Sequence, residues 1–150
     1  MRYRMAAAVL SLGGFFLSLY LYLHKIGVIG ELACGTGGCE KVQFSSFGRF
    51  LGLDVPLIGM GGYLSLLGAC LAALQRPDDP RWPRLLLALS VVGVAFTAYL
   101  KYVEFFVLHA LCRWCVASAV FITLILILAL LDRRSRIGPA TRDADLAESR

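Results

Sequence analysis

Residues 99–131, YLKYVEFFVLHALCRWCVASAVFITLILILALL, place a Cys-x-x-Cys pair in a short gap between two strongly apolar runs. The pair is Cys112 and Cys115, and the runs cover residues 85–108 and 115–131. A helix that crosses a hydrocarbon core of about 30 Å needs about 20 apolar residues. The stretch therefore predicts two membrane-spanning helices, with a pair of thiols at the membrane boundary between them.

The whole chain is unusually apolar: of its 150 residues, 59% are hydrophobic and only 17% are charged. A soluble domain of this length carries more charge. Two further runs, residues 5–23 and 56–74, are also long enough to span a bilayer. We expect an all-α integral membrane protein, a four-transmembrane-helix bundle over residues 1–132. Residues 133–150 are polar and lack apolar periodicity, which predicts a disordered cytoplasmic tail.

The basic residues predict the orientation of this bundle, because positive side chains beside short loops resist translocation. Ten of them lie in the termini and in the loop between the second and third runs, whereas four lie in the other two connections. Both termini are therefore expected in the cytoplasm, and the net charge of +5 needs no nucleic-acid partner to explain it. The ten are Arg2, Arg4, Arg76, Arg81, Arg84, Arg133, Arg134, Arg136, Arg142 and Arg150, and the four are Lys25, Lys41, Arg49 and Arg113.

Residues 24–55 form the longer of the two outward-facing connections. Within it, Phe44, Phe47 and Leu51 have the i, i+3, i+7 spacing of one helix face. We expect a capping outer loop that contains a short amphipathic helix and lies over the mouth of the bundle. The alternative is an irregular interfacial loop.

Four of the five cysteines fall on the outer side in this topology, and Cys70 lies inside the second run as a small buried residue. Disulfides persist in oxidising compartments and are rare in the cytosol, so two exported pairs indicate thiol-disulfide chemistry. Cys115 is expected to begin the fourth helix and Cys112 to lie about one turn before it, at the positive end of the helix, which stabilises a thiolate. Cys34 and Cys39 flank a glycine-rich loop, CGTGGC, which lets that pair meet a soluble protein and then the membrane pair.

Two blander interpretations of the four cysteines stay open, namely static disulfides that hold an outer cap and a zinc site. Two other polar features of the third run also have alternatives. Lys101 and Glu104 share a helix face and are expected to form a snorkelling ion pair, with proton supply or electrostatic tuning of a bound oxidant as the alternative. His109 is either an interfacial residue or a proton shuttle.

Three segments together resemble the vitamin K epoxide reductase family in its bacterial form. They are CGTGGCEKVQFSSFGRFLGL at 34–53, DVPLIGMGGY at 54–63 and YLKYVEFFVLHALCRWCVASA at 99–119. Their order and spacing are specific, since the mobile pair precedes the Cys-x-x-Cys pair. The resemblance implies one catalytic domain over residues 1–132, built as a four-helix bundle around a quinone.

The activity implied by the resemblance is that of a membrane thiol-disulfide oxidoreductase with a quinone, ubiquinone or menaquinone, as electron acceptor. In that family pattern Cys115 lies beside the quinone and Cys112 is its disulfide partner. Cys39 corresponds to the shuttle thiol that exchanges with Cys112, and Cys34 to the thiol that meets the partner protein. The candidate quinone-pocket residues are Ser46, its neighbour Ser45, and the aromatic residues Phe106, Trp114 and Tyr63.

Many bacterial members carry a fused thioredoxin-like domain. This chain ends too early for one, so we expect a separate thioredoxin-like periplasmic or extracytoplasmic partner, in a bacterial inner membrane whose outer side carries the active cysteines. The expected role is to support disulfide formation in exported proteins. Ala119 replaces a pocket tyrosine and residues 54–63 contain no asparagine, which puts epoxide reduction in doubt and leaves quinone reduction as the expected activity.

Overall fold

The computed structural model describes residues 2–30, 41–42, 44–109 and 111–148, with side chains as far as Ser135. Four helices in this part of the chain are long and apolar enough to cross a membrane, which confirms the expected all-α membrane architecture. A π-helical segment, η2, extends the third of them without a break. The elements are α1 (Arg2–Lys25), α3 (Val55–Gln75), α4 (Arg81–Tyr102), η2 (Val103–Val107) and α5 (Arg113–Glu148).

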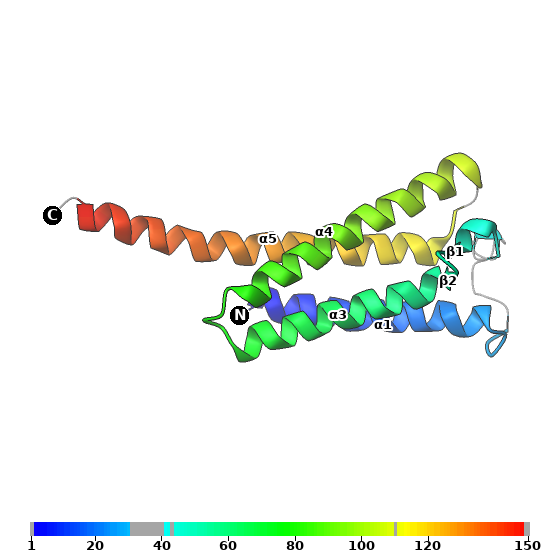
Figure 1. The fold of residues 1–150 in the computed structure, drawn as a ribbon, viewed down its shortest axis with the longest axis horizontal. Coiled ribbons are helices and arrows are strands. Elements are labelled where there is room, and N and C mark those ends of the chain that lie inside the picture. Colours follow the sequence, from blue (N-terminus) through cyan, green and yellow to red (C-terminus); the bar gives the residue numbers. More distant parts are fainter. Residues whose placement is uncertain (1, 31–40, 43, 110, 149–150) are drawn as a thin grey trace.

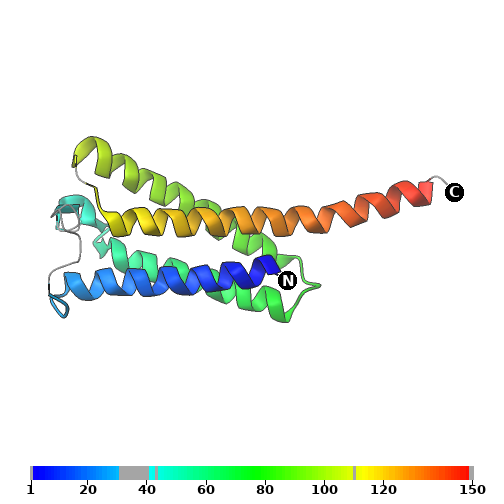
Figure 2. The same ribbon diagram turned by 180° about the vertical axis from the view of Figure 1, so that it is seen from behind.

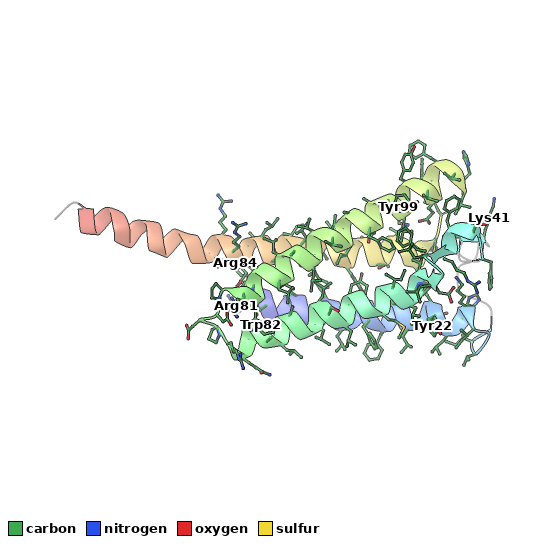
Figure 3. All side chains as sticks on the ribbon, in the orientation of Figure 1. Tyr22, Lys41, Arg81, Trp82, Arg84 and Tyr99 are labelled. Atoms are coloured by element: carbon green, nitrogen blue, oxygen red, sulfur yellow. The ribbon has the colours of Figure 1, made fainter. Side chains whose placement is uncertain are left out.

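The four helices lie side by side in one bundle (Figure 1). α1 packs against α3 and α5, and α4 packs against α5 and α3. The N-terminus and the α3–α4 turn lie at one end, which we call the terminal end, and α5 continues past the bundle on that side (Figure 2). The start of α5 lies at the other end, which we call the cysteine end. Arg81 and Arg84 lie at the terminal end, so both termini and these arginines share one end of the molecule (Figure 3).

Small side chains let the helices approach one another closely. Gly14 of α1 faces Tyr63 of α3 so closely that a Cβ at this position would lie 2.3 Å from the tyrosine ring. Cys70 is fully buried in the same core, as expected of a small apolar residue. Many larger apolar side chains face outward instead, as a lipid-facing surface requires. The core residues are Ala7, Tyr63, Leu66, Ala69, Cys70, Leu86, Ile122, Ile125 and Ala129.

A buried ion pair joins three helices at the terminal end. Arg4 of α1 donates through Nε and Nη2 to the Asp132 carboxylate of α5 at 3.0–3.2 Å. Its Nη1 donates to the carbonyl oxygen of Ala73 in α3. Both charged residues are at most 5% exposed. Arg4 therefore stabilises the bundle directly, besides contributing to the charge asymmetry.

The outer connection folds differently from the expected amphipathic helix, and that expectation is wrong. A short 3-10 turn, η1 (Ser46–Gly48), leads into a hairpin in which β1 (Arg49–Phe50) pairs antiparallel with β2 (Leu53–Asp54). The chain reverses at Leu51 and Gly52, whose φ angles are both positive, 53° and 82°. Positive φ at both central residues is the pattern of a tight hairpin turn. Leu51 is consequently 90% exposed instead of lying on a helix face.

Lys25, the last residue of α1, fastens this hairpin to the bundle. Its Nζ donates to the carbonyl oxygen of Gly48 at 2.9 Å and lies 2.8 Å from the Asp54 carboxylate. The hydrogen bond from Lys25 is the main cause that lowers the pKa of Asp54, with Arg49 adding to it against the effect of burial. The ring of Phe50 packs edge-on against Phe96 of α4 at 5.4 Å. The hairpin thus still covers the cysteine end.

The C-terminal part of α5 also differs from the sequence-based expectation. A disordered tail is predicted from residue 133, whereas the helix continues to Glu148. Within it, Arg113–Ser135 is long and apolar enough to span a membrane. A helix that is already nucleated adds one hydrogen bond for each further residue, and three of the residues 140–148 are alanine, which has the highest helix propensity.

The Arg4–Asp132 pair gives a prediction about stability. Asp132→Met should lower the free energy of unfolding by about 3–5 kcal/mol, because it removes one partner of a buried ion pair. The double variant Arg4→Met/Asp132→Met should recover most of that loss, because no buried charge is then uncompensated. Helix content followed through a titration with a denaturing detergent measures both values. Equal losses in the single and double variants would contradict this assignment.

Candidate active site

Cys112 occupies the N-cap position of α5, immediately before the first helical residue Arg113. Its sulfur accepts a hydrogen bond from the backbone N–H of Cys115 at 3.4 Å, and its carbonyl oxygen accepts the N–H of Val116 at 3.0 Å. An N-cap side chain normally supplies an oxygen for the free N–H groups of the first turn. Here a sulfur does so. Both thiols therefore belong to one turn at the positive end of a helix.

The surroundings of Cys112 favour its thiolate. The hydrogen bond with the Cys115 thiol is the main cause that lowers the pKa of Cys112, and the Cys115 backbone N–H adds to it. Burial acts in the opposite direction, since Cys112 is fully buried. The net pKa lies below the ordinary thiol value of 9.0, in the direction expected from the sequence. The thiolate is the attacking form in disulfide exchange, so this position is chemically activated.

A compact apolar cluster encloses Cys112. It contains Leu21 of α1, with Tyr20 and Val42 packed against it. Cys34 and Cys39 lie in the segment 31–40, which is outside the described residues. Val42 is in the short described segment, residues 41–42, that follows it. Val42, three residues after Cys39, therefore packs against the same cluster as Cys112.

Of the expected quinone-pocket residues, Trp114 packs in the Cys112 cluster and Tyr63 contacts α5 one turn after Cys115. The Trp114 ring packs against Tyr20 at 5.3 Å, and its buried indole N–H has no hydrogen-bond acceptor among the described residues. The Tyr63 hydroxyl donates to the carbonyl oxygen of Ser118 at 3.0 Å and lies 2.9 Å from the Ser118 hydroxyl. Ser118 is three residues after Cys115 in α5. Tyr63 therefore joins α3 to α5 below the thiols.

The other three expected residues lie in different places. Ser45 donates its hydroxyl to the carbonyl oxygen of Val42 at 2.7 Å, and Val42 packs against the cluster that contains Cys112. Ser46 begins η1 and is exposed. Phe106 packs with Tyr102 at 4.9 Å on the outer surface of η2. The structure thus separates Phe106 from the ring pair formed by Trp114 and Tyr20.

Glu104 is the site residue whose main contact sequence reasoning missed. It is 3% exposed and lies in η2, and its carboxylate accepts both the Lys101 ammonium and the backbone N–H of Cys112. Pairing with Lys101, three residues earlier, is enough to explain a glutamate in this span. The sequence therefore gave no reason to expect a second contact between Glu104 and Cys112. The available signal was an acidic residue inside an apolar span, which is a functional candidate by default. His109 is exposed and has a positive φ of 47°.

The lowered pKa of Cys112 gives a prediction about pH. Replacing Cys115 by Ala should raise the pKa of Cys112, because it removes the main lowering contact and leaves the burial. The thiolate absorbance of a variant in which Cys34, Cys39 and Cys70 are replaced by Ala measures the pKa, with Cys115 present or absent. At a fixed pH below 9.0 the variant without Cys115 should hold less Cys112 thiolate. An equal or larger thiolate fraction without Cys115 would contradict the assigned cause.

Comparison with known proteins identifies the family. The profile of the vitamin K epoxide reductase family matches residues 5–130. The chain is also similar to vitamin K epoxide reductase complex subunit 1 of Mus musculus, with 33% identity over 124 aligned positions that cover 73% of this chain and 77% of the mouse protein. The matched range covers most or all of each of the four spans and includes the Cys-x-x-Cys turn at the start of α5. The chain therefore belongs to the vitamin K epoxide reductase family and is a membrane redox enzyme of that type.

Proposed function

We propose that this chain is a quinone-dependent thiol-disulfide oxidoreductase. In this proposal it transfers electrons from a separate thioredoxin-like protein, through Cys34 and Cys39 and then Cys112 and Cys115, to ubiquinone or menaquinone. It would thereby support disulfide formation in exported proteins. The observation that carries the proposal is the position of Cys112: it is a buried N-cap thiol, hydrogen-bonded to Cys115, in a cluster with Leu21 against which Val42 also packs.

Chain connectivity supports exchange between the two pairs. Val42 packs against the Cys112 cluster, and Cys39 precedes Val42 by three residues. Three residues of extended chain span at most about 11 Å. Covalent geometry therefore limits how far Cys39 can lie from Val42, and so favours exchange between Cys39 and Cys112 in this proposal. Cys34 is five residues further from that anchor, which suits the thiol that meets a second protein.

Each transfer between thiol pairs moves two electrons through a mixed disulfide. A thiolate of the partner attacks Cys34 and displaces Cys39, and the partner's second thiol then displaces Cys34 and closes the partner's disulfide. The Cys39 thiolate next attacks Cys112 and displaces Cys115 as a thiolate. Cys34 then attacks Cys39, which releases Cys112 and re-forms the Cys34–Cys39 disulfide. The lowered pKa of Cys112 makes it a better leaving group in that last displacement.

The reduced membrane pair is then reoxidised. A quinone, when bound, accepts two electrons and two protons, which balances the closure of the Cys112–Cys115 disulfide. The chain's part is to hold both sulfurs on one turn and to exclude water from Cys112, which is fully buried. Trp114 adds a buried N–H donor that has no acceptor among the described residues, and a quinone carbonyl oxygen would satisfy it. Trp114 is next to Cys115 in the chain, so a hydrogen-bond donor for a quinone oxygen is available beside the pair of thiols.

The proposed location is a bacterial inner membrane, with both termini in the cytoplasm and the cysteine end on the periplasmic or extracellular side. Two features support it. The N-terminus and the basic α3–α4 turn lie at one end of the bundle, and α5 leaves on the same side. This arrangement agrees with the excess of basic residues in those segments and with the rule that such segments stay inside.

The relay predicts a division of labour between the two pairs. Cys39→Ala should lower quinone reduction driven by a reduced thioredoxin-like protein by about a hundredfold or more, because delivery to Cys112 is lost. It should leave quinone reduction by a small permeant dithiol nearly unchanged. Cys115→Ala should abolish both reactions, because no complete pair then faces the quinone. Quinone absorbance with purified protein in detergent measures all four rates.

Cys70→Ser is the matched control for these variants, since Cys70 is a buried thiol in α3 that belongs to a different core cluster from Cys112 and Cys115. It should keep both activities. If the four cysteines instead form static disulfides or hold zinc, Cys115→Ala should leave quinone reduction no different from that of the wild-type protein. Substantial turnover by the Cys115 variant would therefore exclude the relay.

Orientation gives a separate prediction. In intact cells treated first with a permeant reductant, a membrane-impermeant thiol reagent should modify variants that keep only Cys34 or only Cys39. A variant that keeps only Cys70 serves as the unlabelled control. Labelling of Cys34 and Cys39 only after the membrane has been opened would reverse the proposed orientation.

A further inference from the structure

Glu104 lies at the junction between η2 and the active-site turn. It is the second residue of the π-helical segment Val103–Val107, where the N–H of Leu108 donates to the carbonyl oxygen of Val103 at 3.0 Å. A π-helical segment inserts one residue into the helical register and is frequent at functional sites. The insertion changes which side chains turn inward. Glu104 is 3% exposed, whereas the next residue, Phe105, is 62% exposed.

The Glu104 carboxylate divides its two oxygens between two partners. Oε2 accepts the Lys101 ammonium, and Oε1 accepts the backbone N–H of Cys112, eight residues further along the chain. A snorkelling pair on the surface of α4 would need only the first contact. Burial of a carboxylate is costly unless its oxygens are paired, so both contacts are required to keep it in place.

The contact with Cys112 meets a specific need of the helix start. The N–H of an N-cap residue is commonly accepted by a Glu or Gln side chain three residues later, in a capping box. In α5 that place is occupied by Cys115, which supplies its own N–H to the Cys112 sulfur instead. Glu104 provides the missing acceptor from the preceding helix. Cys112 is therefore held at its N–H by Glu104 and at its sulfur by the first turn of α5.

We propose that Glu104 is a positioning residue that fixes Cys112 against Cys115, with Lys101 balancing its charge. The proposal rests on the proposed function, in which the pair must close and open a disulfide repeatedly. A disulfide forms only within a narrow range of Cβ–Cβ separations and dihedral angles, so a fixed Cys112 backbone favours closure. The charge balance matters because a lone carboxylate beside Cys112 would disfavour its thiolate, and Lys101 acts in the opposite direction.

Lys101 also has access to solvent that Glu104 lacks. The lysine side chain is 27% exposed, against 3% for the glutamate. Both line a cavity of about 370 Å³ on the outer face of η2, together with Tyr102, Phe105 and Leu111. The ion pair therefore forms the wall between this cavity and the buried Cys112 turn, and Glu104 faces the turn.

The test measures how readily the Cys112–Cys115 disulfide closes, without quinone or partner protein. Protein in which Cys34, Cys39 and Cys70 are replaced by Ala is equilibrated with reduced and oxidised glutathione. It is then quenched with acid, denatured and tagged on its free thiols, so the burial of Cys112 does not affect the readout. The ratio of disulfide to dithiol gives the effective concentration of one thiol at the other, which rises when the pair is preorganised.

Glu104→Met has similar length but no comparable acceptor, and it should lower the effective concentration about tenfold or more, the effect of losing one hydrogen bond to a charged group. Tenfold corresponds to about 30 mV in a two-electron couple. Glu104→Gln keeps an acceptor oxygen without the charge and should stay within about threefold of the wild-type value. Asp132→Met removes the carboxylate of the other buried ion pair, at the terminal end, and should leave the equilibrium unchanged.

Two results would overturn the proposal. An unchanged ratio in Glu104→Met would show that Cys112 needs no anchor. An equal fall in Glu104→Gln and Glu104→Met would show that the charge of Glu104, and not its hydrogen bond, sets the equilibrium. Where Glu104→Met does not fold, a roughly tenfold fall in Glu104→Gln leads to the same conclusion, because that variant keeps the acceptor oxygen and loses only the charge. Because the assay contains neither quinone nor protein donor, its result is independent of whether the proposed relay is correct.

Discussion

The lack of hydrogen-bonding solvent in a bilayer is the constraint on which this structure depends. Every backbone N–H and C=O inside the hydrocarbon must find a partner within the protein, and a helix provides those partners internally. Only the ends of the helices keep free backbone groups. The beginning of α5 is such an end, and the chain places Cys112 there, with its sulfur on one of those N–H groups. The reactive thiol and the helix cap are the same residue.

Buried charges organise both ends of the bundle around this turn. At the terminal end, Arg4 joins α1, α3 and α5 through Asp132 and a backbone carbonyl. At the cysteine end, Lys25 ties the outer hairpin to α1, and Glu104 ties η2 to Cys112. Each carboxylate has a cationic partner, as low-dielectric surroundings require. The ion pairs fix the helix ends, and the fixed ends hold the thiols at the boundary of the membrane.

The sequence predicted the parts of this protein that depend on composition and on local order. The four apolar runs predicted the four spans, and the position of Cys112 before an apolar run predicted a thiol at the start of a helix; the structure confirms both. The hairpin was not predicted, because its apolar spacing also fits a helix and the positive φ at Leu51 leaves no mark in the sequence. The contact between Glu104 and Cys112 was equally hidden, since it depends on a π-helical register. The roles of Cys34 and Cys39 remain predictions, because both lie outside the described residues.

The central claim is that electrons pass between the two pairs through a bond between Cys39 and Cys112. It is tested most directly by trapping that bond in a protein in which Cys34 and Cys115, the two resolving thiols, are replaced by Ala. After mild oxidation in the membrane and tryptic digestion, mass spectrometry should find the peptide that contains Cys39 joined to the peptide that ends at Arg113 and contains Cys112. Trypsin cleaves after Lys25, Lys41, Lys101 and Arg113, so each remaining cysteine falls on a separate peptide. Recovery of Cys39 and Cys112 as free thiols, or of Cys39 joined only to Cys70, would contradict the relay.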